Sequence, residues 1–369
     1  MSKPTQSVII TGTGSYTPAK VLTNDEMAKI VDTSDEWISS RTGIKERRIS
    51  HVSTATLASL AAKRALAAAD LDPRELDLII MGTACPDTLI PNSGSMVQDS
   101  IGATNAAVFD LNAACTGFVY GLSVGTAMIR SGAMKKVLVI GADRIPYFLD
   151  YTMRDVAVLF GDGAGAVILE ADDEESGMIA ERLGCDGDAR GILTARDAGT
   201  VRERFSGIDG YYDINFEGPE IFKRAVRGMG EAVNDVLSKS GVAAEDIDLL
   251  VPHQANVRII ETLMKRLKAP EEKVVVNIQK YGNTSAATVP IALCEALEEG
   301  RVKPGDHILT AAFGAGLTWG AALIKWGDRV TPLRECEDDL PPSNQTALEL
   351  LKPWIDGCRE AVAQKAKAE

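Results

Sequence analysis

Short apolar runs alternate along this chain with longer segments whose apolar residues follow helical spacing. The runs at 78–81, 106–109 and 137–141 each stand beside such a segment. Strands that alternate with helices are typical of βαβ units, in which parallel strands are covered by helices on both faces. The pattern therefore predicts an α/β protein built on parallel sheets.

The same order of apolar runs returns in the second half of the chain, at an offset of about 170 residues. Three pairs of strand positions match, namely Asp77 with Asp248, Leu138 with Ile308, and Val108 with Val275. We therefore predict two repeated halves, residues 1–172 and 173–326. The pattern stops after Trp326, and residues 327–369 form an extension. It contains a predicted helix opened by Thr346 and Glu349 as a capping box, and the pattern assigns it no chemistry.

A cysteine stands where the third predicted strand meets a buried helix. Cys115 lies between the apolar run 106–109 and the long apolar segment 117–130. The N–H groups and positive end of a helix stabilise a thiolate, so we expect a lowered pKa for Cys115. Small neighbours leave room for a ligand beside the sulfur. A nucleophile is one interpretation, and a buried structural cysteine is the other.

Two polar residues of the second half complete a chemical set. His253 follows the strand at 249–252, and Asn283 is expected to be the counterpart of Cys115, so that the two meet between the halves. Parallel-sheet proteins place their sites at the carboxyl ends of strands. A cysteine nucleophile with histidine and asparagine donors suits acyl transfer from a thioester. The two donors would then stabilise the enolate left when a malonyl-type thioester loses carbon dioxide.

Composition restricts the other classes of function. With 45% hydrophobic and 25% charged residues, the chain is typical of soluble globular proteins. No apolar run reaches the roughly 18 residues of a membrane span, and no leader pattern opens the sequence, so we expect a cytoplasmic protein without membrane contact. The net charge of −13 disfavours nucleic-acid binding. Six scattered cysteines and three histidines predict neither a metal site nor a disulfide framework.

Five motifs resemble β-ketoacyl-acyl carrier protein synthase III, and the resemblance covers residues 7–326. It implies a thiolase-like fold, in which two pseudo-repeated βαβαβαββ halves form a five-layered α-β-α-β-α core. It also implies a homodimeric acyltransferase without a cofactor, which condenses acyl-CoA with malonyl-acyl carrier protein and so initiates fatty acid synthesis. The motifs are Asn-Ala-Ala-Cys115-Thr-Gly-Phe, Phe160-Gly-Asp-Gly-Ala-Gly, Val251-Pro-His253-Gln-Ala-Asn, Gly282-Asn283-Thr-Ser-Ala-Ala and Phe313-Gly-Ala-Gly-Leu-Thr-Trp-Gly.

The resemblance assigns a role to each matched residue. It makes Cys115 the acylated nucleophile, with His253 and Asn283 as the decarboxylation pair. The backbone N–H groups of Cys115 and Ala315 would form the oxyanion hole; the family often has glycine where Ala315 stands, and a backbone donor tolerates that change.

Coenzyme A and the carrier protein would bind through aromatic and basic residues. Trp37 and Arg41, within Asp-Glu-Trp37-Ile-x-x-Arg41-Thr-Gly-Ile, are similar to the family's adenine clamp, and Arg154 matches a further coenzyme A contact. The acidic carrier protein needs a local basic patch on this acidic chain. Residues that match this patch or lie beside it are Lys223, Arg224, Arg258, Lys265 and Arg266.

The acyl pocket departs from the family pattern. Phe216 stands where a smaller residue is common, and the loop 201–212 is unusual; Phe160 is a further expected pocket residue. Leu89 and Ile90 resemble the segment that closes the partner's pocket across the dimer interface. Acetyl is the default primer, but medium-chain or branched primers stay open.

The sequence also bears on four other functions. A thiolase would need a second cysteine near Phe313, and an elongating enzyme would need a second histidine that neither His51 nor His307 supplies. A starter-unit enzyme of polyketide or alkylquinolone-type synthesis shares the full triad and stays an alternative. A non-catalytic scaffold homologue is disfavoured because each catalytic residue is present.

Overall fold

Two mixed β-sheets form the body of the protein. The computed structural model describes residues 6–172, 176–195 and 214–368, so the loop 201–212 lies outside the described residues. The first sheet has the order β1 (Ser7–Tyr16), β7 (Gly163–Asp172), β6 (Lys136–Asp143), β4 (Leu78–Gly82) and β5 (Ala107–Leu111). The second has the order β8 (Gly177–Cys185), β13 (Thr318–Lys325), β12 (His307–Gly314) and β11 (Leu249–Pro252).

The strand order of the second sheet repeats that of the first. A parallel bridge from Leu250 to Val274 supplies the position that corresponds to β5. The three strand pairs inferred from the sequence therefore occupy equivalent places: β4 and β11, β6 and β12, and β5 and the Val274 bridge. The repeated halves predicted as part of the fold class are confirmed.

The prediction of parallel sheets is wrong for one strand in each sheet. β7 pairs antiparallel with both β1 and β6, and β13 pairs antiparallel with both β8 and β12. Parallel neighbours need a crossover, usually a helix packed on the sheet. β6 and β12 instead lead into the next strand without such a helix, so the chain returns in the opposite direction.

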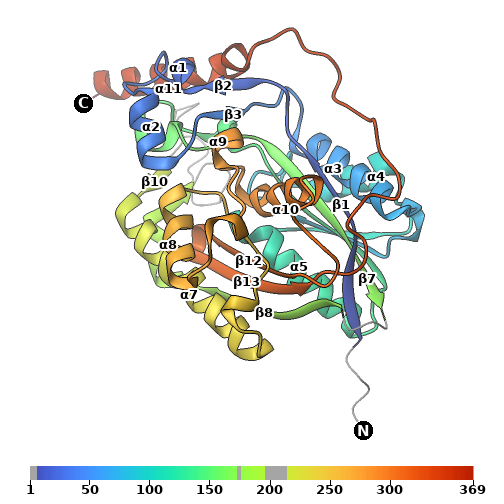
Figure 1. Ribbon diagram of the computed structural model, residues 1–369. Coiled ribbons are helices and arrows are strands. Elements are labelled where there is room, and N and C mark those ends of the chain that lie inside the picture. Colours follow the sequence, from blue (N-terminus) through green and yellow to red (C-terminus); the bar gives the residue numbers. More distant parts are fainter. Residues whose placement is uncertain (1–5, 173–175, 196–213, 369) are drawn as a thin grey trace.

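Helices and sheets stack in five layers (Figure 1). α3 (Thr54–Ala69) and α4 (Ser93–Ile101) cover the outer face of the first sheet, and their apolar residues form one core with Ile79, Ile140 and Ile168. α5 (Gly117–Arg130) and α10 (Thr288–Glu298) lie between the sheets. α7 (Gly218–Ser240) and α8 (Val257–Leu267) cover the second sheet. The predicted α-β-α-β-α core is confirmed.

Shorter elements cap one end of this body. The strands are β2 (Val21–Thr23), β3 (Glu46–Arg48), β9 (Leu193–Ala195) and β10 (Ile214–Phe216), and the helices are α1 (Asn24–Met27), α2 (Asp35–Thr42), α6 (Arg154–Ala157) and α9 (Ile278–Tyr281). The 3-10 turns are η1 (Pro73–Glu75), η2 (Ala114–Thr116), η3 (Ile145–Phe148), η4 (Gly187–Ile192), η5 (Ala244–Asp246), η6 (Glu271–Lys273), η7 (Ser285–Ala287) and η8 (Ala315–Leu317).

The C-terminal extension crosses the first half before it ends in a helix. Beyond β13 the chain passes α3, where Arg334 pairs with Asp70 and Lys63 with Asp338. It ends in α11 (Ala347–Ala368), which lies beside α1 and β2 (Figure 1). The predicted capping box is present, because the Thr346 N–H donates to Glu349 over 2.7 Å and the Glu349 N–H donates to the Thr346 hydroxyl over 3.2 Å.

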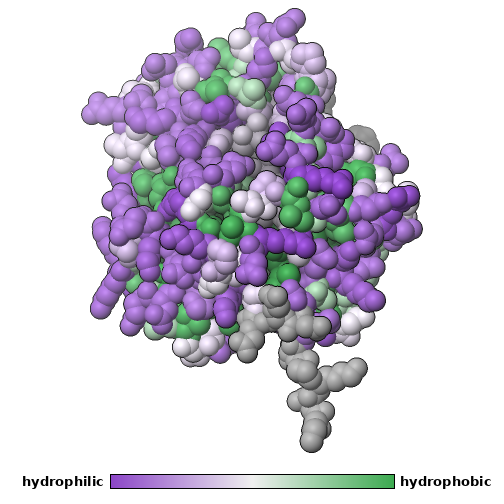
Figure 2. Space-filling model, turned by 45° about the vertical axis from the view of Figure 1, so that its right-hand side comes forward, coloured by the Kyte–Doolittle hydropathy of each residue, from purple (hydrophilic) through white to green (hydrophobic). Residues whose placement is uncertain are grey.

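Hydrophilic residues dominate the face in Figure 2, and hydrophobic residues appear there as separate patches. Within the ranges that the structure describes, no helix combines the length and apolar character that crossing a membrane requires.

Candidate active site

Cys115 lies in η2, the turn that leads from β5 into α5. The side chain of Asn112 accepts a hydrogen bond from the Ala114 N–H over 3.1 Å, and Ala114 takes a left-handed conformation with φ of 48°. Gly314, at the end of β12, approaches the cysteine from the other half. A Cβ atom at Gly314 would lie 2.7 Å from the Cys115 nitrogen, so only glycine permits this approach.

The pKa of the Cys115 thiol is raised to about 12, chiefly because burial disfavours the thiolate. The Ser285 hydroxyl, 3.5 Å from the sulfur, acts in the opposite direction, and the negative charge of Asp143 adds to the rise. The expectation of a lowered pKa is therefore wrong. The residue keeps some exposed surface, yet loss of water outweighs the stabilisation that the helix N-terminus offers. At neutral pH the Cys115 side chain is therefore a neutral thiol.

The expected pairing of Cys115 with Asn283 is also wrong. The turn before α10 repeats the turn before α5: Asn283 accepts a hydrogen bond from the Ser285 N–H over 2.8 Å, as Asn112 does from Ala114. Ser285 is left-handed, with φ of 54°, as Ala114 is. The counterpart of Asn283 is therefore Asn112, and the next residue after Ser285, Ala286, corresponds to Cys115. The two turns still come together between the sheets, because Ser285, which bonds to Asn283, also contacts the sulfur of Cys115.

Ser285 lies among the three predicted catalytic residues and was not itself predicted as a site residue. Its hydroxyl donates to the Cys115 sulfur, and its N–H donates to Asn283. Its carbonyl lies 3.1 Å from the Thr288 hydroxyl, and the same hydroxyl lies 2.6 Å from Nδ1 of His253, so the single hydroxyl proton goes to only one of the two. The motif that contains Asn283 also holds Ser285, but only the fold shows which of its residues face the sulfur.

His253 follows β11 and is buried. Its backbone N–H donates to the Ala311 carbonyl over 2.8 Å, which fixes the loop against β12. Burial lowers the pKa of the imidazole to about 3, so His253 is neutral at physiological pH. Gln254 beside it bonds to the Val275 carbonyl and to the Asn277 N–H, which braces the same loop. A neutral imidazole can donate a hydrogen bond without adding charge to the site.

Asn283 is held on both sides by the backbone that contains Phe160. The Asn283 N–H donates to the Leu159 carbonyl over 2.9 Å, and the Gly161 N–H donates to the Asn283 carbonyl over 3.1 Å. Because the side-chain oxygen of Asn283 is already bonded to Ser285, the amide nitrogen remains as the donor for a substrate.

Asp143, at the carboxyl end of β6, clamps the central turn and was not predicted. Its carboxylate accepts hydrogen bonds from the Thr83 hydroxyl, the Ala84 N–H and the N–H and thiol of Cys85. The other oxygen accepts from the Ala286 N–H over 3.1 Å. A buried acid directly after an apolar strand was the available signal. Across the described parts of the chain, no three His, Cys, Asp or Glu side chains gather in a way that could hold a metal ion.

Cys115 and Ala315 both lie in short 3-10 turns, η2 and η8. Backbone N–H groups in the first turn of a helix have no acceptor within that helix, so such groups are available to an oxyanion. The Thr318 hydroxyl bonds to the carbonyls of Ala113 and Ala315, which ties the two turns together.

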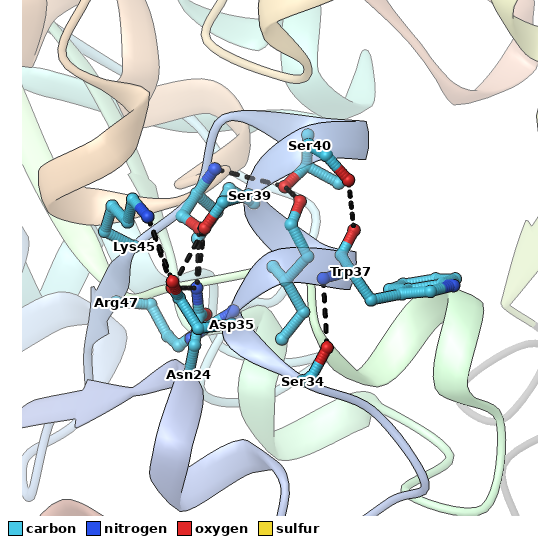
Figure 3. Close-up of polar contacts among 11 residues, drawn as sticks. Asn24, Ser34, Asp35, Trp37, Ser39, Ser40, Lys45 and Arg47 are labelled. Carbon is cyan, nitrogen blue, oxygen red and sulfur yellow. Dashed lines mark hydrogen bonds and ion pairs between the residues drawn. The ribbon is translucent and has the colours of Figure 1, made fainter.

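Trp37 projects from α2, at the end of the molecule that the shorter elements cover (Figure 3). The Ser34 side chain accepts from the Trp37 N–H over 3.1 Å and begins the helix. The ring itself points away from the polar cluster around Asp35. The guanidinium of Arg154 lies 4.4 Å from the ring centroid and that of Arg41 lies 4.6 Å from it. The structure thus brings the three residues of the predicted coenzyme A clamp together.

A polar network that runs from the surface to the buried residues Asn24 and Arg47 holds α2 in place. Asp35 accepts hydrogen bonds from Asn24 and Ser39 and pairs with Lys45, and these contacts lower the pKa of its carboxyl group (Figure 3). Arg47, beneath the helix, donates to the side chain of Asn24 over 2.8 Å and to the Val158 carbonyl. The clamp is therefore anchored to the β2–β3 pair.

The predicted docking residues lie on α7 and α8. Arg258 donates to the Ser40 carbonyl over 2.8 Å, so α8 is tied directly to the helix that contains Trp37. Lys223, Arg258, Lys265 and Arg266 are exposed. Arg224 is already paired with Asp186, Asp188 and Glu220, which reduces what it can offer a partner.

The predicted acyl-pocket residues are spread over several elements. Phe160 pairs with Asn283 through an isolated bridge, and Phe216 is the half-buried last residue of β10. Leu89 and Ile90 lie on the surface of the chain, with 76% and 86% of each residue exposed. Within the described residues, Leu89 and Ile90 therefore do not close the pocket of their own chain.

Comparison with known proteins gives one consistent answer. The family model described as 3-oxoacyl-[acyl-carrier-protein] synthase III matches residues 109–187, and the model of its C-terminal part matches residues 237–326. A Vibrio vulnificus protein named β-ketoacyl-[acyl-carrier-protein] synthase III 2 is 56% identical over 349 residues, which are 95% of this chain and 96% of that protein. This match is longer than residues 1–326, so it includes part of the extension.

Solved structures agree with the curated relatives. The 3-oxoacyl-[acyl-carrier-protein] synthase III of Aquifex aeolicus is 48% identical with a TM-score of 0.81, and covers 86% of this chain and 100% of its own. The priming β-ketosynthase of the R1128 polyketide pathway is 32% identical, also with a TM-score of 0.81, and covers 89% of this chain and 99% of its own.

Proposed function

Because this chain belongs to the β-ketoacyl-acyl carrier protein synthase III family, we propose that Cys115, His253 and Asn283 perform its reaction. The enzyme is an acyltransferase that condenses acyl-CoA with malonyl-acyl carrier protein and initiates fatty acid synthesis. The observation that supports these roles best is the contact of Ser285 with Cys115, Asn283 and the Thr288–His253 pair.

In the first step Cys115 is acylated. The sulfur forms a bond to the carbonyl carbon of the acyl-CoA thioester while the bond to the coenzyme A sulfur breaks. The thiol proton leaves with coenzyme A, which departs as a neutral thiol. The N–H groups of Cys115 and Ala315 stabilise the oxyanion of the tetrahedral intermediate. Because burial raises the pKa of Cys115 to about 12, the thiol enters this step with its proton.

In the second step the malonyl thioester loses carbon dioxide. The enolate oxygen receives hydrogen bonds from Nε2 of His253 and from the Asn283 amide, both of which are neutral donors. The carbanion carbon then bonds to the acyl carbon as the bond to the Cys115 sulfur breaks. The sulfur regains a proton, and the product is a 3-oxoacyl group on the carrier protein.

The primer and the partner surfaces belong to the same proposal. Acetyl-CoA is the default primer, and Phe160 and Phe216 line its pocket. Exposed Lys223, Arg258 and Lys265 offer an acidic carrier protein a basic surface next to the Trp37 helix. A homodimer would cover Leu89, Ile90 and the open edge of β5, whose strand pairs only with β4 among the described strands.

The likeness to the R1128 priming β-ketosynthase favours a specialised starter-unit enzyme as the second candidate. Intact-protein mass spectrometry after incubation with separate acyl-CoAs, from acetyl to decanoyl, distinguishes the two, with Cys115→Ser as the control. An adduct with acetyl-CoA alone, absent in the control, supports the initiator of fatty acid synthesis. Adducts only with longer or branched acyl groups favour the starter-unit enzyme, and the absence of any adduct contradicts both.

A further inference from the structure

The C-terminal helix α11 packs directly behind the coenzyme A clamp. Its buried residues Ala347, Leu351, Ile355 and Cys358 share one apolar cluster with residues of α1, α2, η3 and α6. The ring of Trp354 meets Tyr147 edge-on, with centroids 4.7 Å apart. The helix is thus built into the end of the molecule that contains α2, as Figure 1 also shows.

Arg359 extends from this helix to the rim of a hollow that reaches the clamp. The hollow has a volume of about 530 Å³ and is lined by residues that include Arg359, Arg154, Ile30, Asp32, Tyr151 and Asp155. Arg359 donates to the Ile30 carbonyl over 2.9 Å. Arg154 donates to the Asp32 carbonyl over 3.2 Å and lies over the ring of Trp37. Two arginines from distant parts of the chain therefore bond to carbonyl groups two residues apart in one segment and line the same hollow.

The two guanidinium groups differ in their partners. Arg154 lies 3.9 Å from the carboxylate of Asp155, which offsets part of its charge. Among the residues that the structure describes, Arg359 has no carboxylate within ion-pair distance, and its one hydrogen bond uses one of five N–H donors. An exposed guanidinium with free donors binds phosphate in bidentate geometry. The carboxylates of Asp32 and Asp155 would repel a phosphate, so binding must occur on the Arg359 side of the hollow.

We propose that Arg359 binds a phosphate group at the nucleotide end of acyl-CoA, so that the C-terminal extension forms one wall of the coenzyme A site. This inference rests on the proposed function, because it takes acyl-CoA as the substrate and Trp37 as the adenine contact. It gives the extension a role in substrate binding and leaves the chemistry at Cys115 to the body of the enzyme.

The test compares substrates with and without the nucleotide. The kcat/KM of acyl-enzyme formation is measured with acyl-CoA and with acyl-pantetheine, for an acyl group that the wild-type enzyme accepts. The variants are Arg359→Gln, Arg359→Lys and the control Lys352→Gln, which removes a charge from the same helix outside the hollow. Melting temperatures establish that each variant is folded.

We expect Arg359→Gln to lower kcat/KM for acyl-CoA about tenfold through KM, and to leave the value for acyl-pantetheine unchanged. Arg359→Lys should keep part of the effect, and Lys352→Gln should behave as wild type. Arg359→Gln within twofold of wild type, or an equal loss with acyl-pantetheine, would overturn the proposal. A wild-type enzyme that no acyl-CoA acylates would instead overturn the proposed function.

Discussion

The Ser285 hydroxyl donates a hydrogen bond to the sulfur of Cys115 across 3.5 Å, although the two residues come from different halves of the chain. The contact is possible because the turns before α5 and α10 meet between the two sheets. The same serine orients Asn283 through its N–H, and its carbonyl lies 3.1 Å from the Thr288 hydroxyl. The arrangement of Cys115 and Asn283 thus depends on one turn, η7, and on the Asp143 carboxylate that bonds to it.

Replacing His253 or Asn283 by alanine should separate the two chemical steps. Both side chains act on the enolate oxygen, so condensation should fall by about 100- to 1,000-fold, the cost of removing an oxyanion donor. Acylation of Cys115 should persist, which mass spectrometry of the acyl-enzyme can establish while product formation is followed separately. If either variant also lost acylation, the division of roles would be wrong.

Thr288 should set which nitrogen of His253 carries the proton. A neutral imidazole has one N–H, and the Thr288 hydroxyl has one proton. We expect the hydroxyl to give its proton to Nδ1, the contact at 2.6 Å, and not to the Ser285 carbonyl at 3.1 Å, which keeps the imidazole proton on Nε2, the nitrogen needed as a donor. We expect Thr288→Val to slow condensation about tenfold, since it removes a buried hydrogen bond, and to leave acylation intact. Thr288→Ser should keep the wild-type rate.

Nitrogen-15 NMR of histidine-labelled protein gives a direct measurement of this tautomer, because the chain has only three histidines. The wild-type and Thr288→Ser spectra should show the His253 proton on Nε2. An identical tautomer in Thr288→Val would show that Thr288 does not control it.

The free energy of unfolding should fall at acidic pH because His253 is buried in its neutral form. The pKa of its imidazole is about 3 in the folded protein, against about 6.5 in an unfolded chain. Between these values the unfolded chain binds a proton that the folded protein does not, so each pH unit below 6.5 costs about 1.4 kcal/mol. Above pH 6.5 neither state is protonated and the contribution is constant.

Urea unfolding at pH 7 and pH 5 checks this expectation. The free energy of unfolding of the wild type should fall by about 2 kcal/mol more than that of His253→Gln, which cannot titrate. Parallel losses in the two proteins would contradict it.

Gly141 should tolerate no side chain. A Cβ atom there would lie 2.2 Å from the Ala286 carbonyl oxygen, which is backbone of the central turn and cannot move aside cheaply. We expect Gly141→Ala to lower the free energy of unfolding by about 3 kcal/mol, measured by urea denaturation. Gly357→Ala on α11 is the matched control, since its new Cβ would meet nothing within 4 Å. Equal stability of the two variants would mean that the turn adjusts.

The residues that the sequence identified share a local signal. His253 directly follows an apolar strand, Cys115 lies a few residues after another, and Asn283 lies in a motif of small residues before a buried helix. Such positions can be predicted because the carboxyl ends of parallel strands gather at one edge. The repeated order of strands was accessible for the same reason, since the two halves keep the same spacing of apolar runs.

The structural features that the sequence did not predict, or predicted wrongly, depend on contacts between distant segments. β7 and β13 run antiparallel because the chain returns beside β6 and β12 without a crossover helix, and apolar spacing does not encode this return. Ser285 and Thr288 acquire their roles only where two turns meet. The prediction of a lowered pKa for Cys115 was wrong because the sequence shows the helix that follows the cysteine but not how far packing removes water from the thiol.

The apolar cluster around Ile38 and Leu149 is completed by residues as late as Cys358. During synthesis on the ribosome, both sheets can therefore form while this cluster still lacks its last helix. A chain that ends before α11 would leave the cluster without Ala347, Leu351, Ile355 and Cys358, and the apolar surface so uncovered favours aggregation of nascent or truncated chains. The order of synthesis thus places the completion of this cluster after that of both sheets.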